Sequence, residues 1–296
     1  MSQFGNFHDF CRDSTLPVCN LFRNGTDPMV EKRCQLIGIA VNNSDNYIRN
    51  LGSIVLAALA VCSSIGLILK SERKKAAVGR REIQIFLIGY ILMSITEIFS
   101  VGGFLTNQTI LVWFSALHIG AITATAWVLM LNAVVGYQLL DDGTPLSLGL
   151  VGSSFLAFFV GTTYVAVDTG FNYTGAFTKD PDNIRNYALY VLYLLFPLIM
   201  IAAYVILESV LVINVLGEKI PMRRLSAAAL SFAVGQIFNF VISVHLCEAT
   251  NGKIDGALFE TGFTLLAVIL LWYFWSSITE DEWPEDTMRP MSEVYP

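Results

Sequence analysis

The sequence predicts an all-α polytopic membrane protein with seven transmembrane helices, its N-terminus luminal and its C-terminus cytosolic. Three observations predict this. First, 54% of the 296 residues are hydrophobic and only 14% are charged, whereas a soluble domain carries about a quarter charged residues. Second, seven apolar stretches reach the length of about 20 residues that the hydrocarbon core requires. Third, Lys and Arg concentrate in loops on one side of the predicted bundle.

The apolar stretches set the order of the predicted spans. The first, residues 51–69, contains no charged residue, and the second, residues 83–105, contains only Glu97. Five more follow along the chain, at residues 111–139, 146–167, 187–216, 225–246 and 256–278. Because several of them exceed the thickness of the bilayer, we expect tilted helices or helices that extend into the cytosol.

The distribution of basic residues predicts the orientation. The stretch KSERKKAAVGRRE, residues 70–82, places six Lys or Arg between the first two spans. The loop at residues 217–224 adds three more on the same side. Short loops rich in Lys and Arg stay in the cytosol, so we interpret the first stretch as a topology anchor rather than a patch for nucleic acid or anionic lipid. An odd number of spans then leaves the N-terminus in the lumen.

Glycosylation sequons provide an independent indication of the same orientation. The pattern Asn-X-Ser/Thr occurs at Asn24, Asn42, Asn107 and Asn172. All four fall in segments that the basic residues assign to the lumen, where N-glycans are added. Asn107 lies close to the predicted membrane boundary.

The predicted topology divides the chain into three parts. Residues 1–50 form a luminal N-terminal segment, residues 51–278 the seven-helix domain, and residues 279–296 an acidic cytosolic tail. The tail candidates for recognition by cytosolic machinery are Glu280, Asp281, Glu282 and Trp283. Two interpretations of the tail stay open: a solvated disordered segment, or a short peptide that binds a transport coat.

Four of the five cysteines lie in the predicted lumen. Cys11, Cys19 and Cys34 belong to the N-terminal segment, and Cys247 lies at the luminal end of the sixth span. In an oxidising compartment these four allow two disulfides and three pairings. We favour Cys11–Cys19 with Cys34–Cys247, and disulfides over zinc, because the spacing matches no usual zinc pattern. Cys62, in the first span, is predicted to be a small packing residue.

Ionisable residues in or near the spans are candidates for function by default. They are Glu97, His118, Glu208, His245 and Glu260. We favour a structural role for them, facing the bundle or the headgroups. Three histidines are few for a membrane zinc hydrolase, the last span lacks a Lys for retinal, and no HExxH, GxSxG or phosphate-loop motif occurs. We therefore predict no catalytic residue, no cofactor and no metal site.

Two predicted spans carry small or polar residues at every fourth position. In the fourth span these are Gly149, Ser153, Ala157 and Gly161, and in the sixth they are Ala227, Ser231, Gly235, Asn239 and Ser243. Residues four apart share a helix face, and small residues there let helices approach closely. Both stripes are candidates for contact with a membrane partner, and the alternative for both is packing within the bundle.

Several motifs in a fixed order resemble the fungal chitin synthase export chaperones. The chain opens with FCRDSTLPVCNLF and EKRCQ, continues with VGRREIQIF and NAVVGYQLLDDGTPLSL, and closes with HLCEATNGKIDGALFETGFTLLAVILLWYFWSSITEDEWPED. The most specific parts are Gly-Arg-X-Glu at 79–82, Asp-Gly-Thr at 142–144 and Cys-Glu…Asp-Gly at 247–256. The resemblance runs from about Phe4 to about Asp286, and residues 150–235 match mainly in hydropathy.

This resemblance implies a multi-span protein of the endoplasmic reticulum membrane that is not an enzyme. Its partner would be a chitin synthase, a membrane glycosyltransferase that it helps to fold and to leave the endoplasmic reticulum. It would thereby support chitin synthesis and cell-wall biogenesis, and it could accompany its client to the plasma membrane. The family has no agreed catalytic residues to carry over. The four luminal cysteines match its pattern.

Three other classes share parts of this pattern. A seven-span receptor for a small ligand has the same topology, but the predicted cytosolic loops are short for contact with a transducer. A transporter would show inverted repeats, and none is visible. A membrane-embedded hydrolase lacks sufficient metal ligands.

Overall fold

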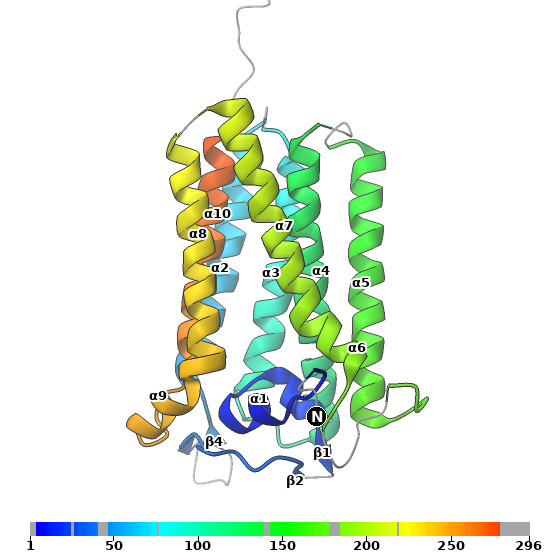
Figure 1. The fold of residues 1–296 in the computed structure, drawn as a ribbon, viewed down its shortest axis with the longest axis vertical. Coiled ribbons are helices and arrows are strands. Elements are labelled where there is room, and N and C mark those ends of the chain that lie inside the picture. The colour runs from blue at the N-terminus through cyan, green and yellow to red at the C-terminus, as the bar shows by residue number, and fades with distance from the viewer. Residues whose placement is uncertain are drawn as a thin grey trace, which may run out of the picture.

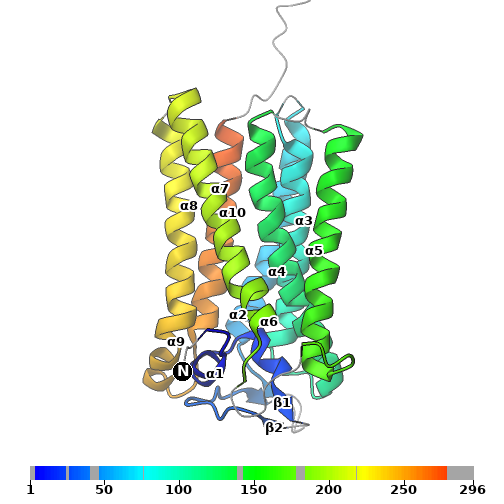
Figure 2. The same ribbon diagram turned by 45° about the vertical axis from the view of Figure 1, so that its right-hand side comes forward.

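The protein is a bundle of long helices with its N-terminal segment packed across one end (Figure 1). The computed structural model describes residues 4–24, 27–40, 47–75, 77–138, 143–177, 184–217 and 219–278. Among these residues, seven helices are long and apolar enough to cross a membrane, which confirms the predicted all-α, seven-span fold. The last described turn of α10 lies at the end of the bundle opposite the N-terminal segment (Figures 1 and 2).

Five spans are continuous helices and two are composite. The continuous ones are α2 (Leu51–Arg73), α3 (Arg80–Val101), α4 (Gln108–Gly136), α5 (Pro145–Phe171) and α10 (Gly256–Ser277). The fifth span joins α6 (Tyr187–Tyr190), a π-helical segment η2 (Val191–Leu195), α7 (Phe196–Val210) and a second π-helical segment η3 (Leu211–Leu216). The sixth joins α8 (Lys219–Ile237), a π-helical segment η4 (Phe238–Ile242) and α9 (Ser243–Ala249). Pro197 accounts for η2, because its ring would collide with the carbonyl of Tyr193 in a regular α-helix.

The basic loops are shorter than the sequence predicts. Helix α2 continues to Arg73 and α3 begins at Arg80, so most basic residues of the predicted loop lie on helix ends. Likewise α8 begins at Lys219. Lys and Arg favour helix, and their long side chains can reach the headgroups from a helical backbone. Arg81 and Glu72 form an ion pair of 2.7 Å across the short connection.

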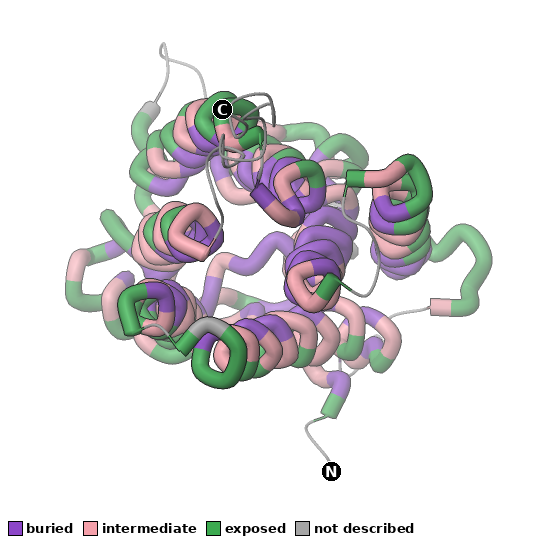
Figure 3. The backbone as a smooth tube through the Cα atoms, turned by 90° about the horizontal axis from the view of Figure 1, so that it is seen from above, coloured by how far each residue is buried: buried purple, intermediate pink, exposed green. Residues whose placement is uncertain are grey.

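Helix α4 lies at the centre of the bundle and packs against α3, α5 and α7. Its small residues allow very close approach. A Cβ atom on Gly120 would lie 2.2 Å from the Thr163 hydroxyl of α5. On the facing side, a Cβ on Gly89 of α3 would lie 2.5 Å from the Thr125 hydroxyl of α4. Close packing of this kind drives helix association in lipid, and Figure 3 shows buried residues toward the interior of the bundle.

The N-terminal cap, the described residues from Phe4 to Asn50, shares its hydrophobic core with the bundle. It contains α1 (His8–Asp13), a 3₁₀ helix η1 (Pro17–Leu21), and two antiparallel ladders, β1 (Arg23–Asn24) with β2 (Asp27–Pro28) and β3 (Ile39–Ala40) with β4 (Tyr47–Ile48). Phe7, Val18 and Leu21 are almost completely buried. They share one cluster with Val112 of α4 and Leu189 of α6. Cap and bundle therefore fold against each other.

One packing prediction is wrong. Cys62 is a free thiol on the exposed surface of α2, outside the bundle interior. The buried face of this helix follows helical spacing and consists of Ser53, Ala57, Ala60, Ser64, Leu67 and Ser71. Position 62 falls outside that stripe. Hydropathy alone does not distinguish the two faces, because lipid and the bundle interior are both apolar.

Candidate functional site

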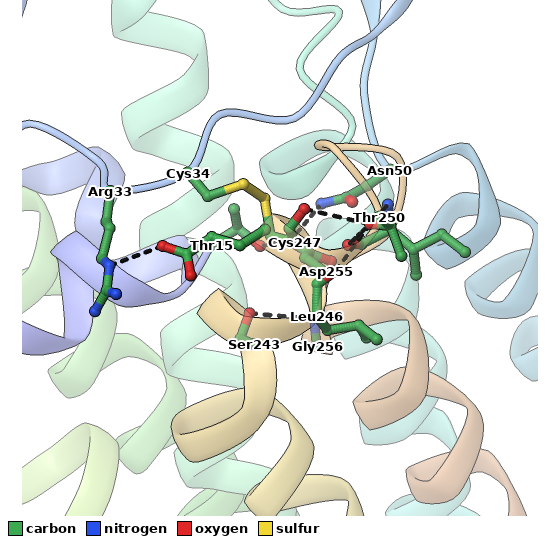
Figure 4. Close-up of a disulfide and its surroundings, with 12 residues drawn as sticks. Thr15, Arg33, Cys34, Asn50, Ser243, Leu246, Cys247, Thr250, Asp255 and Gly256 are labelled. Carbon is green, nitrogen blue, oxygen red and sulfur yellow. Dashed lines mark hydrogen bonds and ion pairs between the residues drawn. A yellow bond between two sulfur atoms is a disulfide. The ribbon is translucent and has the colours of Figure 1, made fainter.

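Two disulfides organise the cap. Cys11 bonds to Cys19 within the cap, with a Cα–Cα distance of 5.5 Å. Cys34 bonds to Cys247 of α9, with a Cα–Cα distance of 6.1 Å, and thereby joins the cap to the sixth span (Figure 4). The structure thus contains the pairing that the sequence analysis favours, and it places all four cysteines at one end of the bundle.

An ion pair lies next to each disulfide. The Arg33 guanidinium forms an ion pair of 2.8 Å with Glu248, the residue after Cys247 (Figure 4). Arg12 donates two hydrogen bonds of 2.8 Å to Asp13, beside the first disulfide. These hydrogen bonds lower the pKa of the Asp13 carboxyl, so this ion pair persists into acidic solution.

Asp255 connects the cap to the start of the seventh span. Its carboxylate is buried and accepts hydrogen bonds from the Thr15 hydroxyl and, at 3.5 Å, from the Asn50 amide (Figure 4). It also accepts from the Ala257 backbone N–H at 3.2 Å and therefore acts as the N-cap of α10. One carboxylate thus stabilises a helix and holds the cap on it.

Gly256 marks the point where the sixth and seventh spans meet. A Cβ at this position would lie 2.1 Å from the carbonyl oxygen of Phe238. The Gly256 N–H also donates to the Ser243 hydroxyl at 3.1 Å. The Cys-Glu…Asp-Gly motif therefore forms a single joint that holds cap, sixth span and seventh span together.

The other two motifs meet at the opposite end of the bundle. Glu82 is completely buried, and its Oε1 accepts hydrogen bonds from the Gly143 N–H at 3.2 Å and the Ser147 hydroxyl at 2.9 Å. Nearby, the Trp275 indole donates to the Val78 carbonyl at 2.9 Å. Sequence reasoning missed Glu82 as a site residue. Its place in the first turn of a span, inside a specific motif, is the signal that could have identified it.

The stripe in the sixth span packs inside the bundle except at Ala227, which is exposed. The Ser231 hydroxyl donates to the Phe263 carbonyl of α10 at 2.9 Å. A Cβ on Gly235 would lie 3.1 Å from the Phe263 side chain. Asn239 and Ser243 are buried as well. This stripe holds α8 and η4 against α10.

The stripe in the fourth span faces outward, away from the interior of the bundle. Gly149, Ser153, Ala157 and Gly161 are all exposed on α5. A Cβ on Gly149 or Gly161 would meet no atom of the described residues within 4 Å. Helix α5 therefore presents a face of small residues to the surroundings of the bundle, and this face is open to a partner helix.

Three of the four sequons have described backbones, and they lie at the end of the bundle that carries the cap. Asn107 is the N-cap of α4, where its side-chain oxygen accepts from the Thr109 N–H at 2.9 Å. Asn172 is exposed and ends α5 in a left-handed conformation. Asn24 lies in β1. Asn42 lies outside the described residues, as do Glu280, Asp281, Glu282 and Trp283 of the tail.

Most of the ionisable residues in the spans face the interior of the bundle. Glu97, His118 and Glu208 are buried, Glu260 is half-buried, and His245 is exposed. The Thr261 hydroxyl donates to Glu97 at 2.5 Å, and His118 Nδ1 donates to the Met93 carbonyl at 3.0 Å. Within the described ranges, no group of three or more His, Cys, Asp or Glu side chains is arranged to hold a metal ion.

Fold and site together define a class: a seven-span membrane protein with a disulfide-fastened cap and an exposed face of small residues. A family model described as "Chitin synthase export chaperone" matches residues 3–288. Curated proteins of that name from Chaetomium globosum and Phaeosphaeria nodorum are each 30% identical over 284 residues, which cover 94% of this chain and 83% of the relative. One from Cryptococcus neoformans is 28% identical, covering 95% of this chain and 76% of the relative. The chain belongs to the chitin synthase export chaperone family.

Membership of this family defines the general role of the protein as an export chaperone. The family consists of export chaperones and not of enzymes, and its name together with the seven apolar helices indicates a membrane protein of the secretory pathway. The receptor, transporter and hydrolase alternatives are not favoured by these matches.

Proposed function

We propose that this protein binds a chitin synthase in the endoplasmic reticulum membrane through the exposed small-residue face of α5 and escorts it to the exit sites. The printed name of the family and its relatives supports the identity of the client. The single observation that carries the choice of surface is the exposure of Gly149, Ser153, Ala157 and Gly161 on one face of α5. Loss of the protein would leave a cell wall poor in chitin.

The physical basis of the proposed binding is close packing of the small residues of α5 against a client helix within the lipid bilayer. Transmembrane helices associate where small side chains let backbones approach closely. A client span with polar groups cannot form hydrogen bonds for them in lipid, and a poorly packed span lacks contacts with neighbouring helices. A second helix against that span would cover those groups until assembly is complete. The face of α5 has the required shape, since a Cβ on Gly149 or Gly161 would meet no described atom within 4 Å.

The test is co-purification of a tagged chitin synthase with the protein in mild detergent. We expect the double variant Gly149→Leu/Gly161→Leu to recover about tenfold less client, which corresponds to roughly 1.4 kcal/mol of binding free energy. Gly66→Leu on α2 is a matched control, because a Cβ there also meets no described atom within 4 Å. Both variants should elute as monodisperse protein.

Two results would defeat the proposed surface or the proposed client. Equal recovery by the α5 variant and the Gly66→Leu control would remove α5 from the interface. A synthase that never co-purifies and reaches the cell surface normally after deletion of this protein would defeat the escort function itself.

We further propose that the acidic tail, residues 279–296, connects the complex to transport-coat machinery in the cytosol. Six carboxylates around Trp283 and Pro284 support this role, because acidic segments with an aromatic anchor suit basic recognition surfaces. Removal of the tail should slow export of the client without reducing its co-purification.

A further inference from the structure

A cavity of about 480 Å³ lies inside the bundle beneath the cap. Its walls come from α3, α4, the fifth and sixth spans, and α10, and they are mostly apolar. Phe10, Thr15 and Pro17 of the cap close one end. Thr15 and Pro17 belong to the loop that the Cys11–Cys19 disulfide closes. Pockets of roughly 300–1,000 Å³ with apolar walls and a few polar groups are typical small-ligand sites.

The packing of the fifth and sixth spans indicates a lateral opening of the cavity between them. Helix α7 packs mainly on α4, and α8 packs mainly on α10, so the two spans contact each other only sparsely. Figures 1 and 2 both show α7 leaning away from α8 toward the cap. Leu198 of α7 lines the cavity and is 59% exposed. The half-buried Ala229 of α8 also lines it. A ligand can therefore enter from the bilayer without crossing water.

Hydrogen-bond acceptors gather at the end of the cavity near the cap. Glu97, Gln236, Asn239 and Glu260 all line it, from three different helical spans. Gln236 donates to Glu260 Oε1 at 3.4 Å, which fixes that carboxyl group. Two carboxyl groups and an amide oxygen in an apolar wall favour a ligand group that donates hydrogen bonds.

Three buried polar atoms along the same cavity have no hydrogen-bond partner among the described residues. They are Thr125 Oγ1, Tyr204 Oη and Asn239 Oδ1. Buried polar atoms without a partner are costly and each calls for an explanation. Asn239 also lies in the π-helical segment η4, and such segments are frequent at functional sites. The three atoms together point to an occupant with polar groups.

We propose that this cavity binds a single-chain membrane lipid whose head group donates hydrogen bonds through hydroxyl or amino groups. The head lies beneath the Cys11–Cys19 loop, against Glu97, Asn239 and Glu260. The hydrocarbon chain leaves between α7 and α8, past Leu198 and Ala229. The cap then acts as a roof that closes the polar end of the site.

Photoreactive lipid probes with a common hydrocarbon chain and different head groups test the proposal on the full-length protein in membranes. The set consists of a sphingosine probe with amino and hydroxyl donors, a monoacylglycerol probe with hydroxyl donors only, and a fatty-acid probe with a carboxylate. We expect the two donor heads to label the protein about tenfold more strongly than the carboxylate. The ratio between sphingosine and monoacylglycerol identifies the preferred donor. Equal labelling by all three probes would overturn the proposal.

The labelled peptides of the wild-type protein provide a second measurement that needs no variant. We expect cross-links on α7 and α8 residues that line the cavity. Cross-links confined to the outer faces of α2 and α5 would show an ordinary annular lipid and overturn the proposal.

Two substitutions with matched controls separate ligand binding from folding. Ala229→Trp should block the mouth and lower labelling about tenfold, whereas Ala227→Trp, on the exposed outer face of the same helix, should not. Asn239→Leu removes an oxygen that has no hydrogen-bond partner among the described residues, so the bundle should still fold, which monodisperse elution checks. Labelling by the donor heads should nevertheless fall to the fatty-acid level in this variant. Unchanged labelling in a stably folded Asn239→Leu protein would contradict the assigned head site.

Discussion

Among single side chains, Glu82 joins two of the sequence motifs at the end of the bundle opposite the cap. A carboxyl group with no exposed surface inside a membrane protein needs hydrogen-bond donors, and Glu82 obtains them from Gly143 and Ser147. The contact joins α3 to the start of α5 across the connection that follows α4. Two motifs about sixty residues apart thus form one structural element.

We expect Glu82→Ala to lower the stability of the bundle by about 1–3 kcal/mol, because the Gly143 N–H and the Ser147 hydroxyl lose their acceptor. Glu82→Gln keeps an oxygen at that place and should remain closer to the wild type. Thermal unfolding in detergent, followed by size-exclusion chromatography, measures the difference. An Ala variant as stable as the Gln variant would show that the acceptor does not matter.

At the level of helices and segments, the second disulfide determines how the cap is attached. Cys34 and Cys247 are 213 residues apart in sequence, whereas Cys11 and Cys19 are 8 apart. Crosslinks that close longer loops restrict the unfolded chain more, and native disulfides typically contribute about 2–4 kcal/mol. Because Arg33 and Glu248 are partly exposed, their ion pair alone contributes little.

Replacement of both Cys34 and Cys247 by Ser should loosen the cap from the bundle. We expect trypsin to cleave the cap, at sites such as Arg33, about tenfold faster than in the wild type, while the seven spans remain folded. Cys62→Ser is the control, since that thiol is free and exposed. If the cap resists trypsin equally well without the second disulfide, the Asp255 contacts rather than the disulfide attach it to the bundle.

Across the whole molecule, the separation of the two ends of the bundle underlies the proposed orientation. The cap, Asn24, Asn107 and Asn172 share one end, and the basic helix ends with Arg73, Arg80 and Lys219 share the other. We propose that the cap end is luminal, because the Lys- and Arg-rich end stays in the cytosol and disulfides form in the oxidising lumen.

In sealed microsomes, a tag at the N-terminus should be protected from protease and a tag at the C-terminus should be digested. Thr174→Ala, which removes the sequon of the exposed Asn172, should abolish one glycosidase-sensitive mobility step. Thr109→Ala should abolish none, since Asn107 caps α4 at the bundle end. Finding both chain ends in the same compartment would overturn the orientation, and with it the luminal role of the cap.

The sequence by itself determined the number, order and approximate limits of the spans. Each span enters the membrane on account of its own apolar length, which is a local property. The basic stretches, which predict the orientation, and the four cysteines, which predict the disulfides, are likewise local features of the sequence. The main error at the span ends, at Arg73, Arg80 and Lys219, arose because basic residues were assigned to loops although they extend helices.

Only the tertiary structure decided which face of each helix turns inward. The two small-residue stripes look alike in sequence, yet Ser231 and Gly235 pack on α10 while Gly149 and Gly161 face outward. The cavity under the cap and the partners of Glu82 were equally invisible in the sequence. The physical reason is that lipid chains are as apolar as a helix interface, so no difference in hydropathy marks the buried side. The inward face is selected by the shapes and hydrogen-bonding groups of neighbouring helices, and these meet only in the folded bundle.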